Sequence, residues 1–452
     1  MLSLSEAAKL IGAEWRGTDV EFTSVTTDSR AIVPGSLFIA LRGERFDGHD
    51  FVAQALAQGA VAAMVDKGDA AWGDIPLLLV ADTRLALGKL AAQWRGRFPV
   101  AMAAVTGSNG KTTVKEMLSA ILRAQSSDGA VLATAGNFNN DIGLPLTLLK
   151  LNAGHRYAVI EMGMNHPGEI AYLSGLAQPN VVLINNAQPA HLEGLGSVEA
   201  VAHAKGEIFQ GLAEQGVAVI NGDDPSAALW RQLAGNRKVT SFGLQKGADV
   251  SATFRLLPAC SELTVNTPQG SIELTLQAPG EHNVRNALAA TAAALALGIA
   301  PETIARGLAG FVPVKGRLQA KPALHDATLI DDSYNANPGS VRAAIDALTA
   351  IPGKRVLVLG DMGELGTEAP RLHREIGAYA KQAGIERLLA LGELSRETVA
   401  GFGPGGQHFE YIEDLLHEVE NLLAPGVTVL VKGSRFMKME RVVQCLVKEA
   451  AI

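Results

Sequence analysis

The sequence predicts an α/β protein of three domains: a small N-terminal α/β domain, a central domain with a parallel sheet and helices on both faces, and a C-terminal α/β domain with a smaller sheet. Three observations lead to this prediction. The length of 452 residues is typical of about three domains. Short apolar strands alternate with helical patterns, and charged or proline-containing segments interrupt the alternation twice. We therefore expect domains over residues 1–98, 99–313 and 314–452.

The N-terminal domain opens with an amphipathic pattern over residues 1–10 that starts with a capping signature. It lacks the basic start and continuous apolar core of a secretory signal, so we expect a folded helix. Strands are expected over residues 36–41, 60–65 and 77–80. Ser29 and Arg30 lie in a loop before them. They either turn the chain in solvent or bind a diphosphate, and the residues alone leave both interpretations open.

A linker is predicted at residues 95–99, where charge and proline precede the central domain. Helical patterns separate the apolar strands that follow, as in a parallel sheet. Ligands of such sheets bind beyond the carboxyl ends of the strands, so polar residues that directly follow a strand are candidates for a binding site. Strands are expected over residues 100–105, 157–160, 181–184 and 217–220.

A glycine-rich loop, Thr106 to Thr113, follows the first central strand and precedes a helical pattern over residues 114–123. Backbone N–H groups of such a loop turn toward an anion, the helix adds its N-terminal dipole, a lysine supplies a cation and a hydroxyl can hold magnesium. The strict motif has a glycine where Val105 stands, so this is a shortened form. The sequence predicts a P-loop-type domain that binds a nucleoside triphosphate. The residues assigned to the nucleotide are Gly107, Ser108, Asn109, Gly110, Lys111, Thr112 and Thr113.

Three charged or titratable residues have two possible interpretations each. Glu161 ends the strand expected over residues 157–160, where it either holds magnesium or is a solvated carboxylate. His191 follows the next strand at the same predicted edge and is either catalytic or structural. Lys205 lies in a helical pattern that begins after Ser197, where a lysine is normally solvated.

Side-chain amides are concentrated in two segments. The loop over residues 136–145 has more amides than a turn needs, and they can orient a polar substrate. Asn283 and Asn286 are three residues apart and share a helical face, which suits the edge of a base unless one of them caps the helix. Arg317 follows the second interruption and either reaches a phosphate or is solvated. The amides of the first segment are Asn137, Asn139 and Asn140.

The C-terminal domain again alternates strands and helices and predicts a Rossmann-like sheet. Polar loops follow three of its strands, at residues 331–338, 360–364 and 432–435. These loops would lie at one edge of the sheet. Strands are expected over residues 328–330, 356–359, 387–391 and 427–431.

Composition excludes several classes of protein. The net charge of −7, from 39 basic and 46 acidic residues, argues against binding to nucleic acid. Cys260 and Cys445 lie far apart without a CxxC pair, which favours a reducing cytoplasm. The alanine-rich run over residues 287–300 is too short to span a bilayer, so we expect a buried helix and no membrane insertion.

With these motifs together, the chain resembles the Mur ligase family along its full length. The order of the motifs over three domains is specific to that family, whereas the phosphate loop alone is not. The resemblance rests on Thr106 to Thr113, Gly136 to Pro145, Glu161 to Asn165, Ala190 to Gly194, Ala204 to Ile208, His282 to Asn286 and Asp331 to Pro338.

The resemblance implies that ATP and two magnesium ions are used. Lys111 and the N–H groups of the loop would hold the β- and γ-phosphates, and Thr112 and Glu161 would hold one magnesium. His191 would hold the second. Lys205 corresponds to the carbamylated lysine of the family, an anion that helps to hold the second ion. Lys111, Lys205 and His191 are thereby implied to be catalytic.

The resemblance also implies where the two nucleotides bind. Asn283 would contact adenine, Arg317 the phosphates and Asp332 the ribose. Ser29 and Arg30 match the Asp-Ser-Arg motif of the family, so the uridine diphosphate end of the substrate would lie on the N-terminal domain.

The implied activity is ATP-dependent ligation of D-alanyl-D-alanine to a UDP-N-acetylmuramoyl tripeptide through an acyl phosphate, in the cytoplasmic synthesis of peptidoglycan. We expect a monomer whose partners are these two substrates. One alternative is the ligase that adds the third amino acid; its diaminopimelate-type members carry an Asp-Asn-Pro-Arg string that is absent here, and the sequence of residues 332–338 favours the dipeptide-adding enzyme. A second alternative is a P-loop nucleotide switch without ligase activity.

Overall fold

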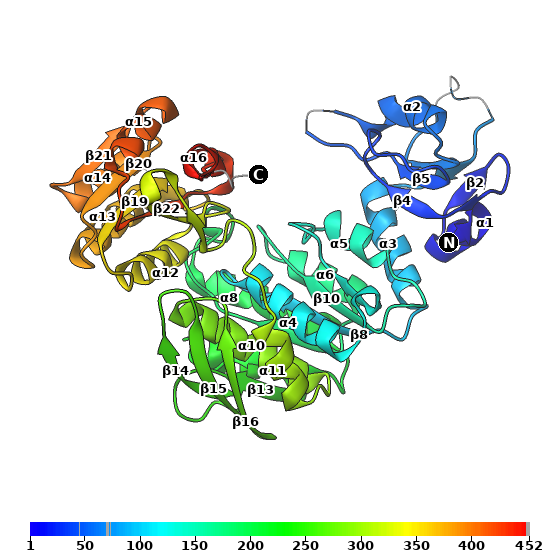
Figure 1. Ribbon diagram of the computed structural model, residues 1–452. Coiled ribbons are helices and arrows are strands. Elements are labelled where there is room, and N and C mark those ends of the chain that lie inside the picture. The colour runs from blue at the N-terminus through cyan, green and yellow to red at the C-terminus, as the bar shows by residue number, and fades with distance from the viewer. Residues whose placement is uncertain (45, 69–71, 73, 449–452) are drawn as a thin grey trace.

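The computed structural model describes residues 1–44, 46–68, 72 and 74–448. Figure 1 shows three lobes, in which the N-terminal and C-terminal domains both stand on the central domain. The predicted α/β fold with three domains is confirmed. Among the described residues, no helix is both long and apolar enough to cross a membrane.

The N-terminal domain holds a five-stranded sheet in the order β2-β7-β6-β5-β4 and a two-stranded pair, β1 with β3. The Ser3 hydroxyl and the Glu6 side chain form the expected capping box at the first helix. The three predicted strands are present, with ends shifted by a residue or two. The elements are β1 (Leu2–Ser3), α1 (Leu4–Ile11), β2 (Glu14–Arg16), β3 (Glu21–Phe22), β4 (Ser24–Thr26), β5 (Ser36–Ile39), α2 (Val52–Ala57), β6 (Ala62–Val65), β7 (Leu77–Leu79) and α3 (Thr83–Arg95).

The central domain has a six-stranded parallel sheet in the order β13-β12-β11-β8-β10-β9. Successive residues of β8 point to opposite faces: Met102 and Ala104 join one apolar core, and Ala103 and Val105 join the other. Helices therefore cover both faces, as predicted. The elements are β8 (Ala101–Thr106), α4 (Lys111–Gln125), β9 (Val131–Ala133), α5 (Gly143–Leu148), β10 (Tyr157–Glu161), α6 (Glu169–Ala177), β11 (Val181–Ile184), α7 (Leu192–Leu195), α8 (Val198–Gly206), β12 (Val217–Asn221), α9 (Ala227–Ala234), β13 (Lys238–Phe242), α10 (Glu281–Ala296) and α11 (Pro301–Ala309).

This domain also contains an antiparallel sheet that was not predicted from the sequence, formed by β14 (Ser251–Leu256), β15 (Ser261–Thr267) and β16 (Gly270–Leu276). Its strands alternate apolar and polar residues because only one face is buried, against α10 and α11. The regular alternation of strand and helix therefore stops before residue 311. The helical pattern expected after Ser197 is also split, since α8 ends at Gly206 and a 3-10 helix covers Glu207–Gly211.

The C-terminal domain has a six-stranded sheet in the order β17-β18-β22-β19-β20-β21, in which only β17 pairs in an antiparallel manner. Helices again cover both faces, and the Rossmann-like prediction holds. The elements are β17 (Gln319–Pro322), β18 (Thr328–Asp332), α12 (Pro338–Thr349), β19 (Lys354–Gly360), α13 (Ala369–Gln382), β20 (Arg387–Leu391), α14 (Ser395–Phe402), β21 (Gly406–Phe409), α15 (Ile412–Leu422), β22 (Val427–Lys432) and α16 (Glu440–Leu446).

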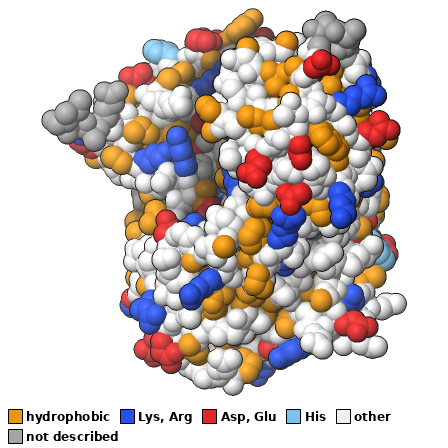
Figure 2. Space-filling view, turned by 90° about the vertical axis from the view of Figure 1, so that its right-hand side faces the viewer, with side chains coloured by type: hydrophobic (Ala, Val, Ile, Leu, Met, Phe, Trp, Pro, Cys, Tyr) orange, Lys and Arg blue, Asp and Glu red, His pale blue; other side chains and the backbone are white. Residues whose placement is uncertain are grey.

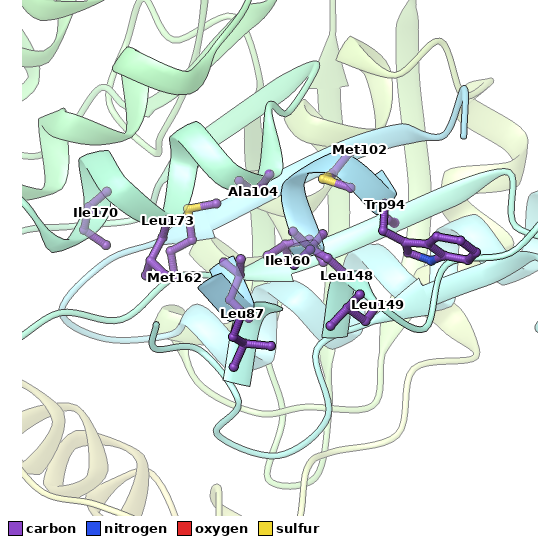
Figure 3. Packing of buried hydrophobic residues seen from close by; sticks show 14 of the residues in the cluster. Leu87, Trp94, Met102, Ala104, Leu148, Leu149, Ile160, Met162, Ile170 and Leu173 are labelled. Carbon is purple, nitrogen blue, oxygen red and sulfur yellow. The ribbon is translucent and has the colours of Figure 1, made fainter. Parts of the chain in front are cut away.

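The junction between the first two domains is apolar and tight. Leu87 and Trp94 of α3 pack among Met102, Leu148 and Ile160, all buried in one continuous core (Figure 3). The Trp94 indole N–H donates to the Leu151 carbonyl at 2.9 Å. Arg95, the last residue of α3, also donates to the Ala177 carbonyl. The segment over residues 95–99, which we expected to be a linker, is therefore anchored to the central domain at its first residue.

Candidate active site

A cavity of about 1560 Å³ opens at the carboxyl ends of the central strands and is lined by all three domains. The phosphate loop, Glu161 and His191 contribute from the central domain, and Arg317 and Asp332 contribute from the C-terminal side. Acidic and basic side chains are interspersed over the face in Figure 2, without an extended region of one sign.

Two glycines fix the path of the phosphate loop. Gly110 has φ +78°, and a Cβ there would come within 2.4 Å of both Asn185 Nδ2 and Asn286 Oδ1. A Cβ on Gly107 would meet Asn185 at 2.9 Å. The loop therefore lies directly against the end of β11 and the start of α10, with no room for larger residues.

The first turn of α4 faces the cavity without a side-chain cap, since its N-cap is Gly110. Its leading N–H groups and the helix dipole are available to an anion. Lys111 Nζ donates to the Gly107 carbonyl at 2.6 Å, so the cation lies over its own loop. Burial lowers the Lys111 pKa, an effect that Glu161 opposes and Arg317 strengthens. This arrangement suits the β- and γ-phosphates of a nucleotide.

Thr112 and Glu161 meet as predicted. The Thr112 hydroxyl donates to Glu161 Oε2 at 2.9 Å, and Asn139 Nδ2 donates to Glu161 Oε1 at 2.7 Å. Glu161 is 2% exposed, which leaves its carboxylate facing the loop rather than solvent. The interpretation of Glu161 as a solvated strand end is excluded. Arg317 from the C-terminal side donates to the same Thr112 hydroxyl at 2.9 Å.

His191 lies at the same edge and contacts the C-terminal domain. Its Nδ1 is 2.6 Å from Glu364 Oε2, a close contact that does not have the geometry of an aligned hydrogen bond. The contact with His191 lowers the pKa of the Glu364 carboxyl; burial opposes this, and the charges of His191 and Lys111 add to it.

Lys205 is 1% exposed and does not line the cavity. It lies on α8, within range of the charge on Lys111. Burial, helped by the charge of Lys111, lowers the Lys205 pKa well below its usual value. The solvated interpretation is wrong: the side chain is a buried amine that favours the neutral form.

A second set of polar side chains in the cavity comprises the α10 amides, Asn283 and Asn286, together with Asp332. Asn283 and Asn286 are both buried on one face of α10, and neither caps the helix. Asn185 Nδ2 donates to Asn286 Oδ1 at 3.0 Å. Lys432 Nζ donates to Asp332 Oδ2 at 2.6 Å, and burial raises the Asp332 pKa while Lys432 opposes that rise.

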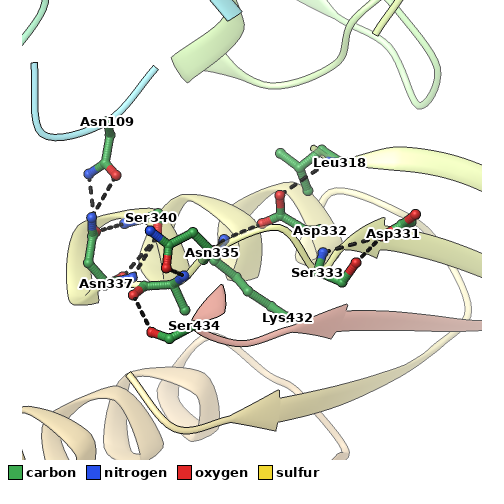
Figure 4. A network of polar contacts seen from close by, with 11 residues as sticks. Asn109, Leu318, Asp331, Asp332, Ser333, Asn335, Asn337, Ser340, Lys432 and Ser434 are labelled. Atoms are coloured by element: carbon green, nitrogen blue, oxygen red, sulfur yellow. Dashed lines mark hydrogen bonds and ion pairs between the residues drawn. The ribbon is translucent and has the colours of Figure 1, made fainter. Parts of the chain in front are cut away.

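A reciprocal amide pair joins the phosphate loop to the C-terminal domain (Figure 4). Asn337 Nδ2 donates to Asn109 Oδ1 at 2.8 Å, and Asn109 Nδ2 donates to Asn337 Oδ1 at 3.1 Å. Asn337 is also the N-cap of α12 and accepts from the Ser340 N–H. The loop that would hold phosphate is thereby tied directly to the last domain.

Some predicted residues are placed apart from this group. Ser29 and Arg30 lie in the N-terminal domain outside the cavity lining, where Arg30 pairs with Asp28 and is 85% exposed. Hydrogen bonds from Arg30 lower the Asp28 pKa to about 2. Asn137 and Asn140 both line the cavity, and Asn140 Oδ1 also accepts from the Gly143 N–H at the start of α5.

Sequence reasoning assigned no role to four residues that support the site: Asn185, Asn186, Gln188 and Glu364. The Asn109 N–H donates to Asn186 Oδ1 at 2.8 Å, and the Asn109 side chain donates to Gln188 Oε1 at 2.6 Å. The rule that ligand-site residues follow strand ends would have found Asn185 and Asn186, because they directly follow β11. Glu364 belongs to the polar loop over residues 360–364, but nothing in the sequence indicates that its partner is His191.

Three family models match the chain: the Mur ligase middle domain over residues 105–294, the Mur ligase glutamate ligase domain over 316–435 and the Mur ligase family catalytic domain over 21–95. The chain belongs to the Mur ligase family.

Relatives of this family resemble the chain over nearly its whole length. It is 46% identical to the UDP-N-acetylmuramoyl-tripeptide--D-alanyl-D-alanine ligase of Escherichia coli, covering 98% of both chains. A crystal structure of MurF from Acinetobacter baumannii matches with a TM-score of 0.93 and 39% identity, covering 98% of both chains. The MurF ligase of Thermotoga maritima, solved in complex with ADP, matches with a TM-score of 0.83 and 28% identity over 93% of this chain and 96% of that one.

Proposed function

We propose that this Mur ligase is the ATP-dependent enzyme that joins D-alanyl-D-alanine to UDP-N-acetylmuramoyl tripeptide. The observation that carries the proposal is the meeting of the uncapped α4 N-terminus, Thr112, Glu161 and His191 at one sheet edge, with Arg317 reaching Thr112 from the other side. The full-length similarity to ligases of that name supports this choice of substrates. The enzyme would act as a cytoplasmic monomer in peptidoglycan synthesis, and so serve cell-wall growth, cell shape and division.

The chemistry explains why such a cavity is needed. A carboxylate is a poor electrophile, so amide formation needs an activated acyl group. In the proposed reaction the terminal carboxylate of the tripeptide attacks the γ-phosphorus of ATP and ADP leaves. The amino group of the dipeptide then attacks the acyl phosphate, phosphate leaves and the amine loses a proton. The protein contributes by orienting reactants and neutralising charge, without a covalent nucleophile.

The residues divide these tasks. The first turn of α4 and Lys111 would hold the β- and γ-phosphates, and Arg317 lies beside Thr112, where it would neutralise charge on the transferred group. Asn283 would contact adenine and Asp332 the ribose. Ser29 and Arg30 would bind the uridine diphosphate end. Asn137, Asn139 and Asn140 would orient the peptide, with Asn139 placed directly against Glu161.

The donor set fits magnesium, which prefers hard oxygen ligands and keeps phosphate and water in its shell. Thr112 and Glu161 offer a hydroxyl and a buried carboxylate 2.9 Å apart. No cluster of three or more His, Cys, Asp or Glu suited to a metal occurs among the described residues. The ions would neutralise charge on the phosphates. Thr112 and Glu161 would hold one ion, and His191 and Lys205 the second.

For Lys205 we propose carbamylation. Only a neutral amine adds carbon dioxide, and burial beside Lys111 favours the neutral form. The addition forms one N–C bond, releases one proton and leaves a carbamate anion that offsets the nearby positive charge. Mass spectrometry under bicarbonate, with carboxylate rescue of Lys205→Ala, tests this; unchanged turnover in the alanine variant would remove the proposal.

The function is tested by phosphate release with ATP, magnesium, UDP-N-acetylmuramoyl tripeptide and a panel of acceptors. Release that depends on D-alanyl-D-alanine supports the proposal. Release that instead needs the dipeptide precursor and a single amino acid would identify the ligase for the third residue. Release that depends on neither substrate would identify a nucleotide switch. Sedimentation of the same sample tests the monomer.

A further inference from the structure

Glu364 is the acidic residue of the C-terminal domain that contacts the predicted second ion site. It follows β19 and lies against His191, which precedes α7 of the central domain. The two backbones also meet, since the Glu193 N–H donates to the Glu364 carbonyl at 3.3 Å. The contact therefore joins two domains at a residue of the active site.

Both partners adopt a backbone conformation that is rare for residues with a side chain. His191 has φ +56° and Glu364 has φ +63°. Such conformations are strained for these residues and persist where the surroundings determine them, often at functional sites. Here two of them face each other across one domain boundary, which fixes where the imidazole and the carboxylate can meet.

The loop that carries Glu364 is fixed by contacts with the residues that follow β22 and with the start of α7. The Gly363 N–H donates to Ser434 Oγ at 2.8 Å, and a Cβ on Gly363 would lie 2.8 Å from the Phe436 ring. A Cβ on Gly366 would lie 3.5 Å from the Glu193 Cα. The carboxylate is thus presented to His191 by a packed loop.

The chemistry of the contact depends on which ring nitrogen it uses. A carboxylate beside Nδ1 favours the tautomer with its proton there, which leaves the Nε2 lone pair free. A histidine that binds a metal usually directs its other ring nitrogen to a carboxylate, a carbonyl or water, and losing that partner costs about 10–100-fold in metal affinity.

We propose that Glu364 is a positioning residue that orients His191 for a divalent cation, so that the C-terminal domain supports the second ion site through the ring of His191. The inference rests on the proposed function, because it takes His191 as a ligand of that ion. It assigns Glu364 to the ring of His191 and not to the ion itself.

The test uses Mn²⁺ as the probe, titrated into the full chain with a non-hydrolysable ATP analogue and followed by electron paramagnetic resonance. The wild-type chain should bind two ions. Glu364→Ala should weaken the second by about 10–100-fold and leave the first unchanged. Glu364→Gln keeps an oxygen that accepts from Nδ1–H and should retain most of the affinity. Glu368→Ala, which removes a nearby carboxylate paired with Arg371 on the surface, is the matched control.

Three results would overturn the inference: one ion in the wild type, wild-type affinity in Glu364→Ala, or equal losses in the Gln and Ala variants, which would make Glu364 a direct ligand. Melting temperatures of the variants separate these results from misfolding. Acceptor-dependent phosphate release by the wild type reports on the proposed function independently, so the two can fail separately.

Discussion

The N-terminal domain meets the central domain through buried apolar side chains, whereas the C-terminal domain meets it mainly through polar ones. Leu87 and Trp94 sit in a core shared by the first two domains. At the other junction Asn337 pairs with Asn109, and Arg317 reaches Thr112. Leu192 adds an apolar contact there. We expect the first junction to be a fixed joint and the second to open and close around the nucleotide.

The difference follows from what each contact costs to break. Separating a packed apolar interface exposes hydrocarbon to water, at about 25 cal/mol per Å². A hydrogen bond between amides is exchanged for hydrogen bonds to water and contributes only about 0.5–1.5 kcal/mol net. A domain that must release product is therefore better attached by polar contacts.

The largest effect on stability should come from the apolar junction. Leu87 is completely buried, and Leu87→Ala should lower the free energy of unfolding by about 2–5 kcal/mol through lost burial and a new cavity. Urea denaturation measures the loss. Turnover per folded molecule should stay near that of the wild type. A loss of nucleotide affinity without a loss of stability would contradict the view that this junction is a fixed structural joint.

Removing the cation of the phosphate loop should lower activity and leave stability nearly unchanged. Lys111→Ala removes a donor aimed at the phosphates and should lower kcat/KM by about 100–1000-fold. The melting temperature should stay near that of the wild type, because the Lys111 side chain is half-buried and its ammonium group donates to carbonyls of its own loop. A variant that unfolds but keeps its specific activity would contradict this assignment. Steady-state phosphate release gives the rate.

Acid should weaken the polar junction through His282. Its burial, with the charge of Lys432 from the C-terminal domain, lowers the His282 pKa to about 4. Because this is below the usual 6.5, the unfolded chain binds more protons between the two values, and stability falls as pH falls from 6.5 to 4. The contribution lost is up to roughly 3 kcal/mol.

His282→Gln cannot titrate and should flatten this acid limb relative to the wild type. Denaturation at pH 7, 6 and 5 compares the two chains. Parallel stability curves for wild type and variant over that range would show that His282 is not the group responsible.

The smallest effect should come from the amide pair. Asn337→Ser keeps a cap for α12 but is too short to reach Asn109. A double-mutant cycle with Asn109→Ala should give a coupling of about 0.5–1.5 kcal/mol in the free energy of unfolding. Additivity within about 0.3 kcal/mol would mean that the pair does not hold the junction.

Much of the central sheet and its ligand edge could be predicted from the sequence, because buried parallel strands are continuous apolar runs and Glu161 directly ends one of them. The antiparallel strands β14 to β16 were missed because their alternating pattern is short and half polar. The tight packing of α3 was also missed. Arg95, the last residue of α3, was interpreted as the start of a charged linker. Its guanidinium instead donates to the Ala177 carbonyl of the next domain.

The site was predictable where chemistry has a local signature and not where it depends on distant partners. The phosphate loop can be recognised from eight consecutive residues. Lys205 resembles a solvated lysine on a helix, and only the packing around α8 shows that it is buried. Asn109 and Asn337 are far apart in the chain, so no spacing rule relates them; the same is true of His191 and Glu364.

Distances between spin labels test the contrast between the two junctions most directly. With Cys260 and Cys445 replaced by serine, labels at Glu14→Cys, Lys238→Cys and Glu413→Cys would report from exposed positions in the three domains. We predict one narrow distance between the first two labels, unchanged by nucleotide. The distance between the last two should be broad without nucleotide and narrow with Mg²⁺ and a non-hydrolysable ATP analogue. A nucleotide-dependent change confined to the first pair would contradict the account.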